Sequence, residues 1–309
     1  MLISYVFSFR NEAQNINELV SRVDKSTNIL KDISYEMIFV NDKSTDNSLE
    51  ILLDLQKKYP ITIINMSRRF GVTPCIIAGL GYTKGEAIIY MDADLQDPPE
   101  LVPKLIERYK NGADVVHTTR TKREGEGFFK LWLTKRAYKA INLFSDISLP
   151  ENTGDFKLLS RKVVDHLLSL KEYDPYMRGL SIWVGFNQDF VFYTREARFA
   201  GKSKFPIFST GPTKEFIRGL TAYSASPLYL SFFIGLFTSI ISLGLIIYAL
   251  ISKFLGIASD GSTGILIAIS FFSGVILMTN GILGIYLAKI YYEVKGRPRF
   301  IVDEVLYKK

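Results

Sequence analysis

Two aspartates and a glutamine directly follow a short apolar segment in the first third of the chain. The run Met91-Asp92-Ala93-Asp94-Leu95-Gln96-Asp97-Pro98-Pro99 comes after Ala87–Tyr90. If that segment is a buried strand, Asp92 and Asp94 emerge at its carboxyl end, where open α/β sheets bind ligands. Their spacing places both side chains on one side of an extended backbone. Such oxygen ligands suit Mg²⁺ or Mn²⁺, which bind through carboxylates and substrate phosphates. The pattern predicts a divalent-cation site, with a solvated acidic turn as the alternative.

The elements that must position this run alternate between short apolar segments and helical patterns over residues 1–118. This alternation is typical of βαβ units on a mostly parallel sheet. We expect strands at Leu2–Phe9, Tyr35–Asn41, Ile61–Met66, Glu86–Met91 and Ala113–Thr118, with helices between them. Beyond them we expect a charged loop at Arg120–Gly127, helices at about Phe128–Phe144 and Arg161–Leu170, and an edge strand at Asp189–Arg195.

Polar residues also follow the first two expected strands. The first strand runs into Phe9-Arg10-Asn11-Glu12, and the second ends in Asn41-Asp42. Carboxylate and amide groups at such strand ends can hydrogen-bond a base and a ribose. The glycines of Gly79–Gly85 do not fit a dinucleotide-binding fingerprint, because their spacing is off by one and they lie in a helical pattern. The strand ends therefore predict a nucleoside site.

Two long stretches near the C-terminus, Gly219–Ser252 and Gly261–Ala288, contain no charged side chain. Each has roughly 20 or more mostly apolar residues, which is enough to cross a hydrocarbon core about 30 Å thick. A buried hairpin of core helices is the alternative. Lysines and arginines flank the outer ends of both stretches, so the positive-inside rule predicts cytosolic termini. Met1 leads into a strand-like segment, and we expect no signal peptide.

Charge and cysteine content exclude some classes of protein. The net charge is +7, from 38 Lys+Arg against 31 Asp+Glu. In a membrane-tethered chain this excess favours anionic headgroups and phosphorylated ligands, and no nucleic-acid-binding motif accompanies it. Cys75 is the only cysteine, which excludes an internal disulfide. With His117 and His166 as the only histidines, a His/Cys zinc site is excluded as well.

The motifs and their order resemble family 2 glycosyltransferases with a GT-A fold. More narrowly, they resemble the polyprenyl-phosphate glycosyltransferases, the group of dolichyl-phosphate mannose synthase and the bactoprenol glucosyltransferases. The matching segments are Val40–Asp46, Ser67–Gly71, Met91–Pro99, Gly154–Arg161, Met177–Leu180, Trp183–Phe186 and Arg198–Lys204. The resemblance covers nearly the whole chain, and the two uncharged stretches match the bactoprenol branch.

The resemblance implies an α/β fold with a Rossmann-like, mostly parallel sheet, followed by two transmembrane helices. The expected parts are a cytosolic GT-A domain at 1–208, an amphipathic interfacial connector at 209–227, a two-helix transmembrane domain at 228–288 and a basic cytosolic tail at 289–309. The implied activity is inverting transfer of one sugar, glucose or a related hexose, from a UDP-sugar to undecaprenyl phosphate at the bacterial cytoplasmic membrane. Departures from the family at Lys43, Arg69 and Val72-Thr73-Pro74 leave the sugar open.

Two rival functions stay open at this point. One is a processive polysaccharide synthase of the same fold, although its usual Gln-x-x-Arg-Trp motif is absent from the sequence. The other is a non-catalytic membrane scaffold that has kept the fold. Small residues in the uncharged stretches, such as Gly281 and Gly284, would allow close helix packing and a homo-oligomer.

The resemblance also assigns roles to individual residues. Metal ligands would be Asp92, Asp94 and Gln96. Donor nucleotide ligands would be Phe9, Asn11, Glu12, Asp42, Arg68 and Asp92. The acceptor phosphate would meet Arg120, Arg123, Arg198 and Lys204, for which solvated surface charges are the alternative.

The catalytic residues would be Asp94 and Asp155, the latter often described in the family as the general base. A phosphate monoester has its second pKa near 6, so the acceptor oxygen is largely deprotonated at neutral pH. We therefore expect Asp155 mainly to position the acceptor or arginine side chains. The alternative for Asp155 is the N-cap of a helix over 156–170.

Overall fold

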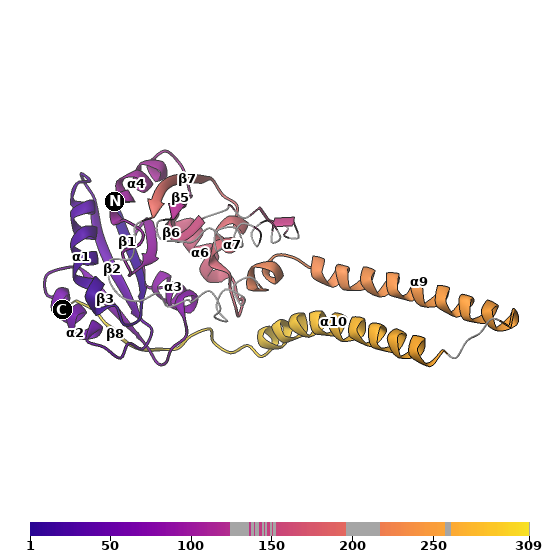
Figure 1. Ribbon diagram of the computed structural model, residues 1–309. Coiled ribbons are helices and arrows are strands. Elements are labelled where there is room, and N and C mark those ends of the chain that lie inside the picture. The colour runs from indigo at the N-terminus through magenta and orange to yellow at the C-terminus, as the bar shows by residue number, and fades with distance from the viewer. Residues whose placement is uncertain are drawn as a thin grey trace. The chain divides into compact units, whose positions relative to one another are not determined.

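The computed structural model describes residues 1–123, 153–195, 217–256 and 261–308, together with a few positions between 136 and 150. These residues form two compact units (Figure 1). The first contains most of the described chain up to Gly219 and resumes at Pro298, whereas the second runs from Leu220 to Arg297. The sequence therefore leaves the first unit and returns to it.

The first unit is built on an eight-stranded sheet with the order β7-β5-β6-β4-β1-β2-β3-β8. Neighbours β1, β2, β3 and β4 pair in parallel, as do β5 and β7, whereas β6 and β8 pair antiparallel with their neighbours. The mostly parallel α/β sheet predicted from the sequence is thereby confirmed. The strands are β1 (Leu2–Phe9), β2 (Ser34–Asn41), β3 (Ile61–Met66), β4 (Ala87–Asp92), β5 (Val115–Arg123), β6 (Thr153–Ser160), β7 (Gln188–Arg195) and β8 (Val302–Leu306).

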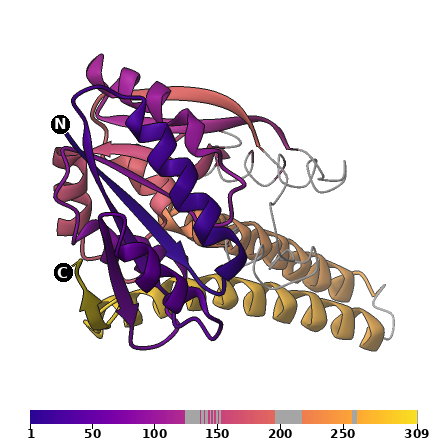
Figure 2. The same ribbon diagram turned by 90° about the vertical axis from the view of Figure 1, so that its left-hand side faces the viewer.

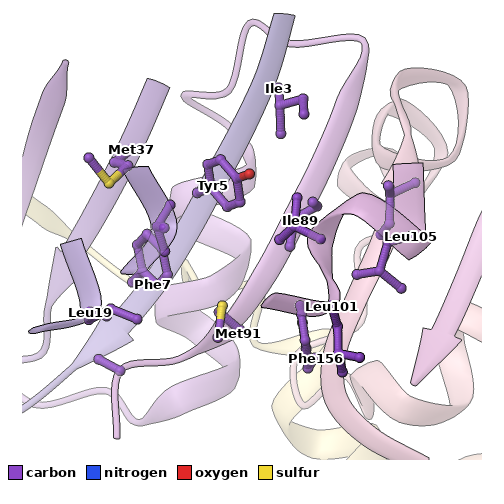
Figure 3. Packing of buried hydrophobic residues seen from close by; sticks show 14 of the residues in the cluster. Ile3, Tyr5, Phe7, Leu19, Met37, Ile89, Met91, Leu101, Leu105 and Phe156 are labelled. Carbon is purple, nitrogen blue, oxygen red and sulfur yellow. The ribbon is translucent and has the colours of Figure 1, made fainter. Parts of the chain in front are cut away.

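Helices cover both faces of this sheet (Figures 1 and 2). They are α1 (Ala13–Asn28), α2 (Ser48–Gln56), α3 (Val72–Leu80), the short 3-10 helix η1 (Pro99–Leu101), α4 (Val102–Lys110), α6 (Arg161–Ser169) and α7 (Met177–Trp183). Helices α1 and α4 pack on the face that carries Phe7 and Phe39, where the main apolar core lies (Figure 3). Helix α3 packs on the other face, because a Cβ on its Gly79 would lie 2.4 Å from Val6.

The same alternation places the residues of β4 and β6. Ile89, Met91, Phe156 and Leu158 belong to the main core with α1 and α4. Side chains alternate along a strand, so Tyr90, Asp92, Asp155 and Lys157 lie on the opposite face. Helices α6 and α7 contact β6. A polar row therefore runs along the face that α7 helps to cover.

Strand β6 is not among the elements predicted from the sequence. The alternative of Asp155 as a helix N-cap is wrong, because Asp155 lies inside β6 and Ser160 caps the following helix. The loop expected at Arg120–Gly127 is also wrong in part, since β5 continues to Arg123. The physical reason is that β6 is held by two antiparallel neighbours, β4 and β5, which lie far from it in sequence. The expected helix at 128–144 lies mostly outside the described residues.

The expected basic tail at 289–309 contains another missed strand. Strand β8 pairs antiparallel with β3 and closes that side of the sheet. The side-chain amide of Gln56 donates to the carbonyl of Leu306 at 2.9 Å, and the amide of Ser67 donates to the carbonyl of Ile301 at 3.0 Å. The strand reads Val302-Asp303-Glu304-Val305-Leu306; its two adjacent acidic residues are exposed, and its apolar residues are half-buried.

The second unit contains helices α9 (Ser226–Phe254) and α10 (Ser262–Val294). Both are long and apolar enough to cross a membrane, judged by length and composition, with mean hydropathies of 2.4 and 1.8 over their candidate spans. The two helices contact each other, and the hydroxyl of Tyr286 on α10 donates to the carbonyl of Ser224 at 2.7 Å. Of the expected connector at 209–227, only the part from Ile217 onward is described, and it is helical over 217–222.

Candidate active site

The carboxyl ends of three parallel strands bring the predicted donor-binding residues together. In the sheet register Phe9 of β1 lies beside Asn41 of β2, and Ser8 of β1 lies beside Asp92 of β4. The amide of Asp42 donates to the carbonyl of Phe9 at 3.0 Å. The polar segments that follow β1, β2 and β4 therefore share one edge, where open α/β sheets bind ligands.

Asp42 is buried at this edge and shapes the loop after β3. Its carboxylate accepts hydrogen bonds from the amides of Phe70 at 2.6 Å and Gly71 at 3.0 Å. Gly71 has a φ of +98°, which favours glycine. The guanidinium of Arg68 lies 4.0 Å from the centre of the Phe70 ring. Asp42 thus fixes the loop that carries Arg68, and direct binding of a nucleoside by either residue stays a prediction.

Asn11 and Glu12 connect the turn after β1 to the start of α2. The Asn11 side chain accepts from the Thr45 amide at 2.8 Å and donates to the Thr45 hydroxyl at 3.1 Å. The backbone amide of Glu12 donates to the Ser48 hydroxyl at 3.0 Å. The buried carboxylate of Glu12 accepts a hydrogen bond from the side-chain amide of Asn15 at 2.6 Å. These bonds hold two strand-end turns against each other. Their predicted contacts with the donor nucleotide stay predictions.

A group of carboxylates lies at the end of β4. The chain turns directly after Asp92, so the extended geometry expected for Asp92 and Asp94 is wrong. In the turn the Asp94 carboxylate accepts a hydrogen bond from the backbone amide of Gln96 at 3.2 Å. Burial, reinforced by the negative charges of Asp155, Asp94 and Asp97, raises the pKa of Asp92 to about 7. Burial and the neighbouring negative charges thus both hinder ionisation of Asp92.

Asp92 and Asp155 come from strands that are neighbours in the sheet. Tyr90 of β4 lies opposite Lys157 of β6 in the antiparallel register. Continued by two residues, this register brings Asp92 opposite Asp155 on the same face. Among the neighbouring charges, that of Asp155 is the strongest in raising the pKa of Asp92. The site thus joins the end of β4 to the start of β6.

The donor atoms around Asp92 fit a divalent cation. Among the described residues no group of three or more His, Cys, Asp or Glu side chains is arranged to hold a metal by itself. The predicted set of Asp92, Asp94 and Gln96 contains only two carboxylates, which is the number that Mg²⁺ commonly uses when substrate phosphates supply further ligands. A cation here would also relieve the repulsion that raises the pKa of Asp92. The assignment of these three residues stays a prediction.

Asp155 forms a two-pronged ion pair with Arg178 of α7. The guanidinium donates from Nε at 3.0 Å and from Nη2 at 2.5 Å to the two carboxylate oxygens. Burial alone would raise the pKa of Asp155, but the charge and hydrogen bonds of Arg178, aided by Lys157 and Arg120, lower it to about 2. The carboxylate is therefore ionised at neutral pH and is a weak base. This geometry is the one expected of a residue that positions an arginine.

Arg120 is buried beneath the acidic turn. Its guanidinium donates to both oxygens of Asp97 at 3.2 Å and to the Tyr193 hydroxyl at 3.0 Å, and that hydroxyl also bonds Asp97. Gly154 leaves room for this group, since a Cβ there would lie 2.8 Å from Arg120 Nη2. Arg120 would have to leave Asp97 to bind an acceptor phosphate, so the structure favours a role in holding the turn.

The other residues predicted to meet the acceptor phosphate are not placed by the structure. The side chain of Arg123 lies outside the described part of the molecule, although its backbone ends β5. Arg198 and Lys204 lie outside the described residues altogether. Their roles stay predictions.

Several residues that the structure brings to the site were not predicted from the sequence. Arg178 lies within the quoted Met177–Leu180 motif, so the motif itself was the signal. Asp97 belongs to the acidic run, and its distance from Arg120 in sequence hid the pair. Tyr193 and Lys157 gave no signal, because a tyrosine in an edge strand and a lysine in a polar segment are ordinary.

Known proteins that are similar to this chain are glycosyltransferases. The model of the family described as Glycosyl transferase family 2 matches residues 4–168. An uncharacterized glycosyltransferase of Synechocystis is 38% identical over 98% of this chain and 95% of its own length. The bactoprenol glucosyl transferase of Shigella phage SfX is 36% identical over 98% of this chain and 99% of its own. A prophage bactoprenol glucosyl transferase homolog of Escherichia coli is 34% identical over 99% of both chains.

A solved structure shares the fold. Glucosyl-3-phosphoglycerate synthase from Mycobacterium tuberculosis, in complex with Mn²⁺, UDP and phosphoglyceric acid, superposes with a TM-score of 0.51. The match covers 72% of this chain and 78% of that one at 17% identity, and so concerns the fold alone. Together with the family match and the near full-length relatives, it identifies the first unit as a GT-A catalytic domain. The chain is a glycosyltransferase and belongs to glycosyltransferase family 2, with bactoprenol glucosyl transferases among its relatives.

Proposed function

We propose that the protein is a membrane-anchored, inverting glycosyltransferase that moves one hexose, glucose in the simplest case, from a UDP-sugar to polyprenyl phosphate. Relatives that match over nearly their whole length are named bactoprenol glucosyl transferases. Helices α9 and α10 have the length and composition to hold such an enzyme at the bilayer that contains its acceptor. The catalytic unit and both termini would lie on the cytosolic side of the bacterial cytoplasmic membrane.

The observation that carries the proposal is the meeting of two differently charged halves on one face of the sheet. One half is the acidic group of Asp92 and Asp94 at the end of β4, which repels anions unless a cation is bound. The other is the Asp155–Arg178 pair, which presents a guanidinium next to it. A diphosphate donor needs the first half together with a metal, and the positive charge of Arg178 would attract a phosphate acceptor to the second half.

Mg²⁺ or Mn²⁺ held by Asp92, Asp94 and Gln96 would neutralise the negative charge that develops on the departing nucleoside diphosphate. The remaining work falls to the side chains of the protein. Asn11, Glu12, Asp42 and Arg68 would orient the nucleotide at the ends of β1, β2 and β3. Asp155 would keep the Arg178 guanidinium turned toward the acceptor phosphate.

The acceptor needs little help from a base. Its phosphate loses the second proton near pH 6, so an oxygen is free to attack the anomeric carbon at neutral pH. Asp155, with a pKa of about 2, would be a weak proton acceptor in any case. What the enzyme must supply is orientation of two reactants in line, and a soluble donor domain tethered beside a lipid acceptor supplies it. A single displacement of this kind gives a β-linked product from an α-linked donor.

The test is a transfer assay with the purified full-length protein. A panel of radiolabelled nucleotide sugars is incubated with a short polyprenyl phosphate and with Mg²⁺, Mn²⁺ or EDTA, and label is counted in the organic phase. We expect one UDP-hexose to give a metal-dependent product carrying one sugar. Asp94→Asn should abolish transfer, whereas Glu100→Gln, which removes an exposed ion pair with Arg22, should not.

Other outcomes of this assay would point to the rival functions. A growing water-soluble polymer would indicate a processive synthase. The absence of transfer and of donor binding under every metal condition would indicate a scaffold. Either result would overturn the proposal.

A further inference from the structure

A fully buried lysine, Lys157, lies on strand β6 two residues from Asp155 of the proposed acceptor half of the site. Lys157 of β6 has 0% of its surface exposed. It lies two residues beyond Asp155 and therefore points to the same face of the sheet. Its neighbours across the sheet are Tyr90 of β4 and His117 of β5. No role in the reaction proposed above uses this side chain.

A continuous chain of hydrogen bonds leads from Lys157 to the arginine of the site. The Lys157 ammonium donates to the Ser181 hydroxyl at 2.5 Å. The Ser181 hydroxyl donates to the backbone carbonyl of Arg178 at 3.1 Å, one turn earlier in α7. The Arg178 guanidinium then grips Asp155, which lies on the same strand as Lys157. The chain closes a loop between β6 and α7.

This arrangement connects both turns of α7 to strand β6, the first through Arg178 and the second through Ser181. Helix α7 has only seven residues, from Met177 to Trp183, so its own backbone bonds hold it weakly. The bond from Lys157 to Ser181 attaches the helix to β6 at one point, and the bond from Arg178 to Asp155 attaches it to β6 at a second. The side-chain amide of Gln188 in β7 also donates to the carbonyl of Ile182 at 3.0 Å. Loss of the bond between Lys157 and Ser181 would let the backbone of Arg178 shift while its guanidinium stays paired with Asp155.

The charge of Lys157 acts on the same pair. Its ammonium is one of the groups that keep Asp155 ionised, together with Arg178 and Arg120, against the negative charge of Asp92 across the sheet. An apolar side chain of the same length would fill the space without paying the desolvation cost of an ammonium. Such a side chain could neither bond Ser181 nor favour the charged form of Asp155. Both effects of Lys157 therefore converge on the geometry of Asp155 and Arg178.

We infer that Lys157 is a positioning residue for the acceptor half of the site, acting through Ser181 on Arg178. The inference rests on the proposed function, because it takes Arg178 as the group that meets the acceptor phosphate. Lys157 itself touches neither substrate. Its loss should harm use of the acceptor and spare binding of the donor, which lies at the ends of β1, β2 and β4.

The test compares steady-state kinetics of four variants in the transfer assay. Lys157→Met removes the bond and the charge, Ser181→Ala removes the bond alone, and Lys157→Arg restores a cation of similar length. Thr118→Val is the matched control, since it removes a buried hydroxyl that donates to the carbonyl of Phe156 in β6 at 2.7 Å without touching α7.

We expect K157M to lower kcat and the acceptor kcat/KM roughly 10- to 100-fold, the size of effect that a displacement near 1 Å produces. The donor KM should stay within about twofold, because the donor residues are untouched. S181A should show a smaller loss of the same kind, K157R should recover part of it, and T118V should resemble wild type. Unchanged kcat in K157M, or a donor KM that rises in step with the loss, would overturn the inference.

Hydrogen exchange measured by mass spectrometry keeps the inference separate from the proposed function. Backbone amides of α7 should exchange faster in K157M and S181A than in wild type and T118V, with no change in peptides around Asn11 and Asp42. If wild type transfers no sugar to polyprenyl phosphate, the proposed function fails while this measurement still decides whether Lys157 holds α7. Unchanged exchange in α7 would overturn the inference whatever the activity.

Discussion

Replacing Lys157 by methionine should make the protein more stable at neutral pH while making it a poorer enzyme. Burial lowers the pKa of the Lys157 ammonium from its usual 10.5 to about 7, against the attraction of Asp155. The unfolded chain therefore binds more protons than the folded one between pH 7 and 10.5. In that window the free energy of unfolding rises with pH. The cost of the buried ammonium is thus greatest at pH 7 and below, and it disappears as the pH approaches 10.5.

The size of the effect follows from the width of this window. A difference of one pKa unit corresponds to about 1.4 kcal/mol, so the window spans at most about 5 kcal/mol. Methionine avoids this cost but loses the hydrogen bond to Ser181, which is worth about 1 kcal/mol. K157M should therefore be about 2–4 kcal/mol more stable than wild type at pH 7. Near pH 10 the two proteins should be equally stable, or wild type slightly more so.

Denaturant unfolding in detergent, followed by near-ultraviolet circular dichroism at several pH values from 7 to 10, measures this difference. The tyrosines are the same in both proteins, and their contribution therefore cancels in the comparison. T118V serves as the control and should be less stable than wild type by a constant amount. A stability difference between K157M and wild type that does not change from pH 7 to pH 10 would refute the reasoning about the buried ammonium.

Three further changes test other parts of the site. Asp94→Asn should lower the apparent affinity for Mn²⁺ and UDP at least tenfold, measured by thermal shift as the concentration needed to raise the melting temperature; an affinity equal to that of wild type would remove Asp94 from the metal site. Arg178→Lys should lower the acceptor kcat/KM roughly 10- to 100-fold with little change in donor KM, because lysine cannot form the two-pronged bond to Asp155; wild-type acceptor kinetics would contradict the role of Arg178. Gly154→Ala should lower stability by about 1–3 kcal/mol in chemical unfolding, since its methyl group would displace the Arg120 guanidinium 2.8 Å away; an unchanged midpoint would show that Arg120 can move freely.

The grouping of the proposed donor residues at one edge of the sheet could be predicted from the sequence because its information is local. Each parallel strand is a short apolar run with a polar end, and parallel strands of one sheet place those ends at the same edge. Asn11, Asp42 and Asp92 could therefore be grouped without knowing which strands are neighbours. Burial of the strands on both faces made the runs easy to see.

The acceptor half could not be predicted in this way because it depends on pairing between distant segments. Strand β6 enters between β4 and β5 against their direction, and its inner face carries Asp155 and Lys157 instead of apolar side chains. Polar and apolar residues alternate only over Asp155–Leu158, which is the shortest run that predicts a strand. The pairing of Asp155 with Arg178 and of Arg120 with Asp97 then follows from a register that no short segment encodes.

Strand β8 has a consequence for how the protein is made. The strand that completes the sheet beside β3 is translated only after both apolar helices have been synthesised. Until then the outer edge of β3 presents unpaired backbone groups, which can recruit strands from other chains. Maturation of the catalytic unit is thus coupled in time to synthesis of α9 and α10, and a ribosome stalled inside α10 would leave a nascent chain whose sheet is one strand short and prone to aggregate.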